Sequence, residues 1–507
     1  MKIGIDLGTT FSLSSIIGEK GNVMMIPDLH FRNTYFTPSI VHINKDNAYV
    51  GEMVEPLLLQ NPELNVIRFF KRKLGEEQPI YYDKEGTAWF PESIAALVLK
   101  KLKHDAENFL GDTVTGTVIT IPAHFNDLQR KAVINSAYLA GIPIQGLIEE
   151  PVAAALHYGI TNNAHDKIIL VYDFGGGTFD VSLVSINQDG IFVIAKDGLI
   201  ELGGKEFDEK IGDLILKQYK EVAGVEIPTT AKNLLHLRRI SEQIKVELCS
   251  SRNQTMVKQT CLLAGIPLEV FITKKEFEAQ IEEFLNQTEN ILLRCIKSAN
   301  LTPQDIDIVL LVGGSSLVPT VHNRVKNIFY RSNQSLFYHE PMKAIVSGAA
   351  LHSCQLDGKA RLFDLPPELR GVSGYNVGVK TIDPKTGRTK IDALIRKNIP
   401  LPVEATKRYY TSRHNQKFMT LEFVQFIDCN SENIRLGNMT IGPFEIAQPN
   451  YPIEVSVKNM ADGTIQVKAY DPQTGKELKQ TFGKDLINGN ELLIQKALVN
   501  STTVNNI

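Results

Sequence analysis

Cysteine is scarce in this sequence, with five in 507 residues. The number is odd, the positions are scattered, and no two cysteines stand in a CxxC spacing. Such a set predicts neither a disulfide framework nor a zinc site, and we expect reduced thiols in a cytosol-like compartment. The cysteines are Cys249, Cys261, Cys295, Cys354 and Cys429.

Excess charge and long apolar runs are also missing. The formal net charge is −3, which gives no electrostatic reason to expect nucleic acid or an anionic membrane as a partner. No apolar run reaches membrane-spanning length, and the strand-like start MKIGIDLG lacks the basic and apolar regions of a signal peptide. We therefore expect a cytoplasmic protein, and the length suggests about three core-sized units.

The clearest feature that is present is an internal repeat. The segment IGIDLGTTFS, residues 3–12, is echoed by LVYDFGGGTFDVS, residues 170–182. Each has an apolar strand pattern, an Asp, a glycine turn and a Thr, and a third apolar strand ends in glycines within residues 306–316. Helical patterns at 126–141 and from Glu149 separate these strands, which predicts an α/β fold. The repeat predicts two similar lobes that face each other across a cleft.

The pattern changes near residue 360. The stretch 360–371 carries two prolines and a short apolar cluster, which is typical of a linker. After it, short alternating runs separated by Gly, Pro, Asn and Asp continue to Phe482, which predicts an all-β unit. The residues that follow Phe482 are too few for a third domain.

The repeated glycine turns suit phosphate. A glycine turn after a strand leaves backbone N–H groups that point into one concavity, where phosphate oxygens fit. Asp6 and Asp173 end the two strands and would hold a hydrated Mg²⁺ between them. Thr9, Thr10 and Thr178 add hydroxyl donors. The alternative is a pair of hairpin turns with capping Asp residues.

These residues resemble the DnaK-type 70-kDa heat-shock protein chaperones, which share a fold group with actin and the sugar kinases. The segments IGIDLGTT, IPAHFNDLQR, EEPVAAALHYG, DFGGGTFD, LGGKEFD and LVGGSS stand in that family's order and spacing, from residue 1 to about 355. The resemblance implies a two-lobed α/β nucleotide-binding ATPase domain of the actin/sugar-kinase/heat-shock type at 1–360, a linker at 361–370 and an all-β sandwich that binds peptides at 371–483. Residues 484–507 would be a short tail, a truncated form of the family's helical lid.

The resemblance also implies ATP or ADP with Mg²⁺ as cofactors. Lys71, in KRKLG, would orient the attacking water and stabilise charge on the γ-phosphate; the alternative is an exposed helix lysine in a basic run. Asp6, Asp173 and Glu150 would hold Mg²⁺ through its waters. The implied catalytic set is Asp6, Lys71, Glu150, Asp173, Thr178 and Asp180. The implied nucleotide contacts are Gly8, Thr9, Thr10, Phe11, Gly175, Gly176, Gly177, Thr178, Gly203, Gly204, Glu242, Lys245, Cys249, Gly313, Gly314 and Ser315.

The adenosine side departs from the family pattern at two positions. The family's GGxxRxP reads GGSSLVP here, so Leu317 replaces an arginine that stacks on adenine, and Met342 stands where the family has Asp. A cation stacked on an aromatic face is worth about 0.5 to 2 kcal/mol. Its loss would weaken nucleotide binding roughly 2- to 30-fold.

The all-β unit resembles the family's peptide-binding sandwich through KIDALIRKNIPLP, PIEVSV and ADGTIQVKAYDPQTGKE. By position, Val379, Ile382 and Met419 would line the side-chain pocket, with Tyr409 and Ser412 on the loops over the peptide. An apolar pocket beside free strand backbone suits an extended hydrophobic segment. The alternative is that Val379, Ile382 and Met419 fill the core of the sandwich.

Communication between the two parts is also implied by resemblance. Pro122 and Arg130 stand at the family's interdomain switch, and the apolar docking segment of the linker matches Leu362, Phe363, Asp364 and Leu365. Gly146 stands where the family has the arginine that J-domain co-chaperones bind, which argues against standard J-domain stimulation. Unfolded client polypeptides are the implied partners, with a J-domain co-chaperone and a nucleotide-exchange factor as further candidates.

The leading hypothesis is therefore an ATP-dependent chaperone that releases peptide with ATP and holds it with ADP. One alternative is a small-molecule kinase on the same fold. It would need a catalytic Asp over a bound hydroxyl substrate, and Asp180 is the only well-placed candidate. Another is a non-catalytic regulator that binds nucleotide and sequesters clients or co-chaperones, an option that Leu317 and Gly146 keep open.

Overall fold

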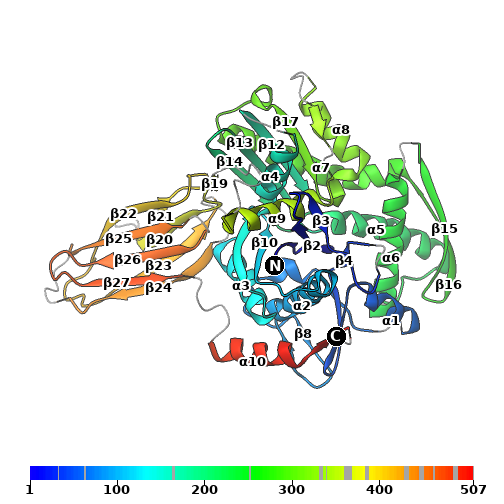
Figure 1. The fold of residues 1–507 in the computed structure, drawn as a ribbon, viewed down its shortest axis with the longest axis horizontal. Helices are drawn as coiled ribbons and strands as arrows, with labels where there is room; N and C mark the ends of the chain where they lie inside the picture. Colours follow the sequence, from blue (N-terminus) through cyan, green and yellow to red (C-terminus); the bar gives the residue numbers. More distant parts are fainter. Residues whose placement is uncertain are drawn as a thin grey trace.

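The structure is a computed structural model that forms an α/β part, an all-β part and a final helix (Figure 1). Among the described residues, no helix is both long enough and apolar enough to cross a membrane. Of the interdomain residues predicted above, Leu362, Phe363, Asp364 and Leu365 lie outside the described residues. The structure describes residues 1–31, 34–61, 64–162, 166–250, 253–330, 335–337, 340–358, 368–382, 387–427, 433–444, 450–460, 463–482 and 489–505.

The first six-stranded sheet has the order β11-β10-β1-β2-β3, with β4 beside β2. Strand β1 pairs in parallel with β10 and antiparallel with β2, so the IGIDLGTTFS segment is a hairpin with a parallel neighbour. The strands are β1 (Lys2–Asp6), β2 (Phe11–Ile17), β3 (Val23–Met25), β4 (Thr37–Pro38), β10 (Gly116–Ile121) and β11 (Ile144–Glu149).

The second six-stranded sheet has the order β18-β17-β12-β13-β14-β19. Strand β12 pairs in parallel with β17 and antiparallel with β13, which repeats the unit built on β1. The expected α/β class is confirmed. The strands are β12 (Lys167–Phe174), β13 (Phe179–Ile186), β14 (Gly190–Leu199), β17 (Ile308–Val312), β18 (Ser335–Phe337) and β19 (Glu368–Arg370).

Two helices, α4 (Glu150–Asn162) and α9 (Ala344–Leu356), lie between the two sheets (Figure 1). Helix α9 packs on β1, α4 packs on β12, and both belong to one buried core. The two helices approach so closely that a Cβ added to Gly348 would lie 1.9 Å from the carbonyl oxygen of Ala153. Only glycine fits at such a backbone contact.

The outer faces of the two sheets carry separate cores. Ile119 of β10 packs in the core under α2 and α3, while its neighbour Val118 points to α4 and α9. This is the two-residue alternation of a sheet that is covered on both faces. The covering helices are α2 (Pro91–Leu110) and α3 (Asp127–Leu139) on the first sheet, and α5 (Gly204–Ala223), α6 (Ala231–Cys249), α7 (Lys274–Ser298) and α8 (Pro319–Ile328) on the second.

Smaller elements extend both sides of the α/β part. One four-stranded sheet, β28-β6-β5-β7, lies beside α1 and α2, and the hairpin β15-β16 lies beside α5 and α6. The bounds are η1 (Gly51–Met53), α1 (Val54–Gln60), η2 (Phe70–Lys73), η3 (Pro303–Asp305), η4 (Gly314–Leu317), β5 (Ile40–Asn44), β6 (Asn47–Val50), β7 (Ile67–Arg68), β8 (Tyr81–Tyr82), β9 (Ala88–Trp89), β15 (Met256–Leu263), β16 (Ile266–Thr273) and β28 (Thr503–Val504).

The all-β part consists of two four-stranded sheets, β21-β20-β23-β24 and β22-β25-β26-β27. Alternate residues of strands from both sheets, such as Phe423 and Val455, are fully buried in one shared core. The bounds are β20 (Asn376–Ile382), β21 (Thr389–Ile395), β22 (Val403–Tyr410), β23 (Met419–Phe426), β24 (Ile434–Ile441), β25 (Pro452–Asn459), β26 (Ile465–Tyr470) and β27 (Glu477–Thr481).

The all-β part is docked on the α/β part. Strand β19 joins the edge of the second sheet beside β14. The Tyr375 hydroxyl donates to the carbonyl oxygen of His124 (2.6 Å), and Lys397 Nζ lies 3.0 Å from an Asp197 carboxylate oxygen. The Gln425 side-chain oxygen accepts from the Asp127 backbone N–H at the start of α3. These contacts place one end of the sandwich against the ends of both large sheets.

The final helix, α10 (Gly489–Ser501), packs on α2 and α3 rather than standing alone (Figure 1). Val499 and Val504 are buried in the core of the first sheet. Strand β28 then pairs in parallel with β6, and the Asn505 side chain exchanges two hydrogen bonds with the backbone of Val50. The tail that we expected as a truncated lid is therefore seen as part of the layer that covers the first sheet.

Candidate functional site

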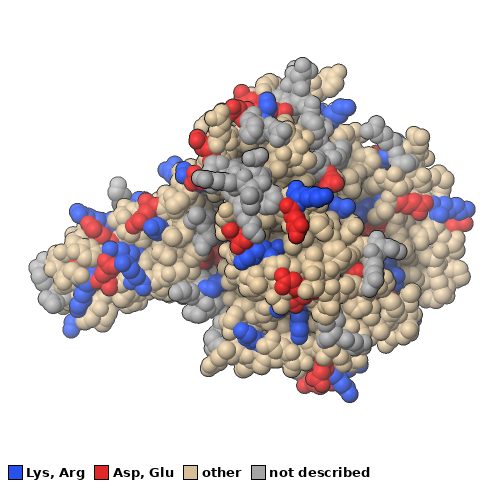
Figure 2. Space-filling model, in the orientation of Figure 1, with Lys and Arg blue, Asp and Glu red and all other residues tan. Residues whose placement is uncertain are grey.

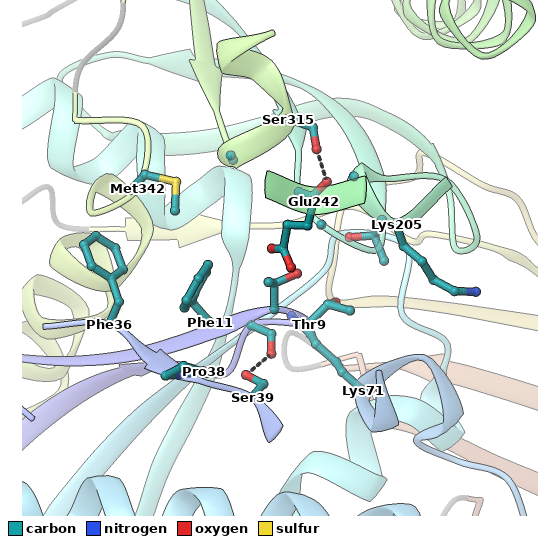
Figure 3. A pocket seen from close by; sticks show the side chains of 18 of the residues that line it. Thr9, Phe11, Phe36, Pro38, Ser39, Lys71, Lys205, Glu242, Ser315 and Met342 are labelled. Atoms are coloured by element: carbon teal, nitrogen blue, oxygen red, sulfur yellow. Dashed lines mark hydrogen bonds between the residues drawn. The ribbon is translucent and has the colours of Figure 1, made fainter. Parts of the chain in front are cut away.

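A cavity of about 560 Å³ lies between the two large sheets, with its floor at the glycine turns (Figure 3). It contains most of the predicted nucleotide and catalytic residues. Of the others, Gly177, Gly203, Cys249 and Asp180 do not line it. The predicted residues that line it are Asp6, Gly8, Thr9, Thr10, Phe11, Lys71, Glu150, Asp173, Gly175, Gly176, Thr178, Gly204, Glu242, Lys245, Gly313, Gly314 and Ser315.

The turn after β1 is held open by serine side chains. Ser39 Oγ donates to the Gly8 carbonyl (2.7 Å), and Ser12 Oγ accepts from the Gly8 backbone N–H (3.2 Å). Figure 3 shows Thr9 and Ser39 at the centre of the cavity floor. The backbone of this turn is fixed from below, which leaves Thr9 and Thr10 facing the cavity.

The turn after β12 packs against the start of α5. Gly204 N–H donates to the Gly175 carbonyl (3.1 Å), and a Cβ added to Gly203 would lie 2.5 Å from the backbone N of Gly177. This contact explains why the LGGKEFD segment has glycine there, although Gly203 does not itself face the cavity. The third turn, after β17, joins the same loop because Ser315 Oγ donates to the Gly175 carbonyl (2.7 Å).

Lys71 and Glu150 form a buried ion pair at one end of the cavity, with 2.6 Å between Nζ and Oε1. Burial alone would lower the pKa of Lys71, but the carboxylates of Glu150, Asp6 and Asp173 outweigh it and raise that pKa. Burial raises the pKa of Glu150 to about 7, opposed by Lys71 and assisted by Asp6 and Asp180. The lysine is therefore charged, and it faces more acidic groups than it can neutralise.

Two further carboxylates near this ion pair, those of Asp173 and Asp180, are not fully hydrogen-bonded by the described residues. Burial, followed by the charges of Glu150, Asp180 and Asp6, raises the pKa of Asp173 well above its ordinary value. Asp173 Oδ2 and Asp180 Oδ2 are buried without a hydrogen-bond partner among the described residues. An excess of buried carboxylate oxygen fits a hard divalent cation such as Mg²⁺. Within the described residues no three acidic, His or Cys side chains form a group that could hold a metal ion.

Asp180 has a partner that the sequence did not predict. His124 Nδ1 is hydrogen-bonded to Asp180 Oδ1, and both side chains are buried. His124 stands in IPAHFNDLQR, between β10 and α3, and Asp180 faces Asp173 across the β12–β13 pair. A histidine that follows a strand has no local signal for such a role, so only the tertiary structure reveals it.

The other end of the cavity combines charged and apolar side chains. Lys245 Nζ is 2.6 Å from Asp208 and donates to the Gly204 carbonyl. Leu317 and Val246 both line the cavity and are 47% and 60% exposed. Burial raises the pKa of the Cys249 thiol, at the end of α6, to about 11. Figure 3 shows Met342 near Phe11 and Phe36, which gives this side an apolar wall.

The predicted peptide residues are only partly brought together. Val379 and Met419 belong to the buried core shared by the two sheets of the all-β part, and Tyr409 packs against that core. Ile382 is 64% exposed at the end of β20, and Ser412 is exposed beyond β22. In this conformation Val379 and Met419 are core residues, as the alternative had it, and Ile382 is not.

The predicted switch residues lie at the contact between the two parts. Arg130 pairs with Glu149, which also pairs with Lys196 (2.6 Å), and a Cβ on Gly463 of the all-β part would be 3.1 Å from Arg130. Pro122 is buried at the end of β10, and its carbonyl accepts from Phe125 N–H. Gly146 stands on β11.

Known proteins resemble this chain over most of its length. A family model described as "Hsp70 protein" matches residues 2–84 and 77–491 of the chain. The chain belongs to the Hsp70 family. It is 33% identical to the Chaperone protein DnaK of Thermosipho melanesiensis over 487 residues, which cover 94% of this chain and 79% of the relative. It is 34% identical over 490 residues to that of Thermotoga maritima, with the same coverage. It is also 33% identical over 516 residues to the Chaperone protein dnaK3 of Synechococcus elongatus, covering 95% of this chain and 66% of the relative.

This Hsp70-family chain is accordingly an ATP-dependent chaperone and an ATPase that uses ATP or ADP with Mg²⁺. The comparisons do not favour a small-molecule kinase or a non-catalytic regulator. Figure 2 shows charges of both signs interspersed on the visible face.

Proposed function

We propose that the chain couples ATP hydrolysis in the cavity to the gripping of extended apolar segments by the all-β part. In this proposal residues 1–360 form a two-lobed domain of the actin type, 361–370 the linker, and 371–483 the peptide-binding sandwich. The repeated strand units around β1 and β12, with the cavity between them, support the two lobes.

The observation that carries the proposal is the buried Lys71–Glu150 pair beside Asp6 and Asp173, directly at the glycine turns. The turns after β1 and β12 would hold the phosphates with backbone N–H groups and with the hydroxyls of Thr9, Thr10 and Thr178. Bound Mg²⁺ would neutralise charge on the phosphate oxygens. Glu150, Asp6 and Asp173 would hold it through water.

Lys71 and Asp180 would then act on the attacking water. The charged Nζ of Lys71 would orient that water and stabilise the charge that develops on the γ-phosphate. Asp180 does not line the cavity in this conformation, but its Oδ2, which is buried and has no partner among the described residues, would accept a hydrogen bond from that water. The adenosine would lie toward Glu242, Lys245, Gly314 and Ser315.

The docked arrangement supports coupling between the two parts. Arg130 and Glu149 link the end of β11 to the all-β part, and Glu149 directly precedes Glu150 in the chain. A change in the position of Glu150 on hydrolysis would therefore shift Glu149 and, through their ion pair, Arg130. Pro122 and the linker residues Leu362 to Leu365 would take part in the same switch.

The proposed clients are unfolded polypeptides with extended apolar segments. Ile382, Tyr409 and Ser412 would contact them, and Val379 and Met419 would do so only if the sandwich opens, because both are buried in this conformation. A J-domain co-chaperone and a nucleotide-exchange factor would act on the chain, although Gly146 removes one arginine contact. A cytoplasmic location is part of the proposal, and fractionation of the source cells tests it.

Steady-state ATP turnover, with and without an apolar peptide, tests the proposed function. We expect phosphate release that the peptide stimulates, no phosphorylated peptide or sugar, and loss of turnover in Asp173→Asn. Peptide release should be faster with ATP than with ADP. Turnover that no peptide changes, or phosphate that appears on a small-molecule acceptor, would contradict the proposal.

A further inference from the structure

His124 occupies a position that links three parts of the molecule. Its ring is hydrogen-bonded to Asp180, its backbone carbonyl receives a hydrogen bond from the all-β part, and it stands between β10 and α3. The side chain is 10% exposed. Nothing in the nucleotide-binding role of the cavity requires a histidine there, because His124 does not line the cavity.

The hydrogen bonding fixes how the ring is used. Nδ1 faces Asp180 Oδ1, and a carboxylate accepts, so Nδ1 carries the hydrogen and donates. Nε2 is buried and has no hydrogen-bond partner among the described residues. A Cβ added to Gly198 of β14 would lie 2.9 Å from Nδ1 and 3.2 Å from Asp180 Oδ1, so β14 closes the pair from the other side. The imidazole is therefore held in one orientation by packing and by a single charged partner.

We propose that His124 is a positioning residue for Asp180 in ATP hydrolysis. By occupying Oδ1, it fixes the carboxylate so that Oδ2 remains free to accept a hydrogen bond from the attacking water. A buried carboxylate held by one charge-assisted hydrogen bond keeps a defined orientation, and small displacements of such groups reduce turnover strongly. The inference rests on the proposed role of Asp180.

The same residue connects Asp180 to the all-β part. The Tyr375 hydroxyl, from the segment just before β20, donates to the His124 carbonyl at 2.6 Å, and both groups are buried. Burial, followed by the charge of Asp180, raises the pKa of the Tyr375 hydroxyl. Docking of the sandwich thus helps to place the ring that places Asp180.

The test compares substitutions at His124 in the full-length chain. His124→Phe keeps the ring volume but removes the donor, and should lower kcat roughly 10- to 100-fold, the range for a hydrogen bond to a charged group. The dissociation constants of ATP and ADP should stay within about 2-fold, because the ring does not face the cavity. His124→Asn places an amide N–H close to the position of Nδ1 and should recover most of the turnover. The matched control is His42→Phe, a buried histidine whose Nδ1 contacts the Asn65 carbonyl, and it should keep wild-type kcat.

Further variants distinguish a wrong role for Asp180 from a wrong role for His124. If Asp180→Asn has wild-type turnover, the proposed role of Asp180 is wrong; if Asp180→Asn is slow and His124→Phe is not, only the positioning role fails. In the double variant the His124 substitution should add little, because its partner is already absent. Should His124→Phe not fold, His124→Ala with added imidazole replaces it, and no recovery by imidazole would overturn the proposal. Equal losses in His124→Phe and His124→Asn, with weakened nucleotide binding, would indicate a merely structural role.

The link to the all-β part has its own measurement. Tyr375→Phe removes only the hydroxyl and should lower kcat by roughly 2- to 10-fold, the range for one neutral hydrogen bond. Combined with His124→Ala it should add nothing further. An unchanged kcat in Tyr375→Phe would show that the sandwich does not act through His124.

Discussion

Lys71 Nζ lies 2.6 Å from Glu150 Oε1 at one end of the cavity, and the two side chains are 4% and 7% exposed. A single lysine there faces Glu150, Asp6 and Asp173, which leaves an acidic excess in a buried site. The excess suits a bound divalent cation, which would offset it and attract phosphate oxygens to the same end of the cavity. Under the proposed function, the phosphates of the nucleotide would therefore bind at the end of the cavity where this pair lies.

Replacement of this lysine gives the first prediction. Lys71→Ala should lower ATP turnover about 10²- to 10³-fold, the loss expected for one preorganised electrostatic group. Nucleotide binding should suffer less, because the glycine turns remain. Phosphate release and calorimetric ATP binding measure the two effects. Lys73→Ala is the matched control, since Lys73 stands on the same turn with its side chain half exposed toward Glu76; comparable losses in both variants would contradict the assignment.

Much of this site was accessible from the sequence because it is local. Each glycine turn follows its strand within a few residues, so Asp6, Thr9, Asp173 and Thr178 could be assigned a common chemistry. Lys71 and Glu150 are 79 positions apart and were reached only by resemblance to the family. No local pattern brings two such distant side chains together.

Other features lay beyond sequence reasoning for the same physical reason. His124 and Asp180 are 56 positions apart, and a buried histidine reads like any core residue until its partner is known. The tail packs against residues that are far away in the sequence, and the hydrogen bonds between Asn505 and Val50 span 455 positions. The apolar residues in the sequence of α10 indicate that the helix packs against something, but they do not indicate which surface it covers.

The second prediction concerns the end of the cavity where the adenine base of the nucleotide would bind. Leu317→Arg restores a cation beside the proposed adenine position and should tighten ATP and ADP alike, by up to roughly 30-fold. Turnover at saturation should be unchanged, because Lys71 and Asp173 are not altered. Leu293→Arg is the control, since Leu293 on α7 is comparably exposed and does not line the cavity. Calorimetry that shows no tightening would mean that the base is held elsewhere.

Glu92 gives a prediction on pH. Its carboxyl is fully buried in the first turn of α2, and burial raises its pKa from 4.5 to about 7, with the charge of Glu76 adding to the effect and backbone N–H groups opposing it. The folded chain thus binds this proton more tightly than the unfolded chain. Stability from this group is complete below pH 4.5 and is lost as pH rises to about 7.

Glu92→Gln should remove that loss. At pH 8 the variant should be more stable than the wild type by about 2 to 4 kcal/mol, and near pH 4.5 the two should be equal. Thermal unfolding between pH 4.5 and 8 measures the difference. Glu85→Gln, at an exposed position, should follow the wild type throughout. A variant that is destabilised equally at every pH would show that the carboxylate is satisfied by its neighbours.

The last prediction concerns the tail. Val499 is fully buried among residues of the first sheet and its helices, and Lys100 Nζ donates to the carbonyls of Val499 (3.0 Å) and Thr502 (2.8 Å). Val499→Ala should therefore lower the free energy of unfolding by about 1 to 3 kcal/mol, the cost of a small cavity in a packed core, whereas Leu493→Ala, at a position that is 60% exposed, should change it little. Removal of residues 489–507 should lower the melting temperature further and increase hydrogen exchange in β6, because β28 no longer pairs with that strand. The rate at which the ADP state releases an apolar peptide should change little, although the free energy of unfolding falls. If the truncation leaves stability intact and only speeds peptide release, the tail acts as a lid on the sandwich and not as part of the core that covers the first sheet.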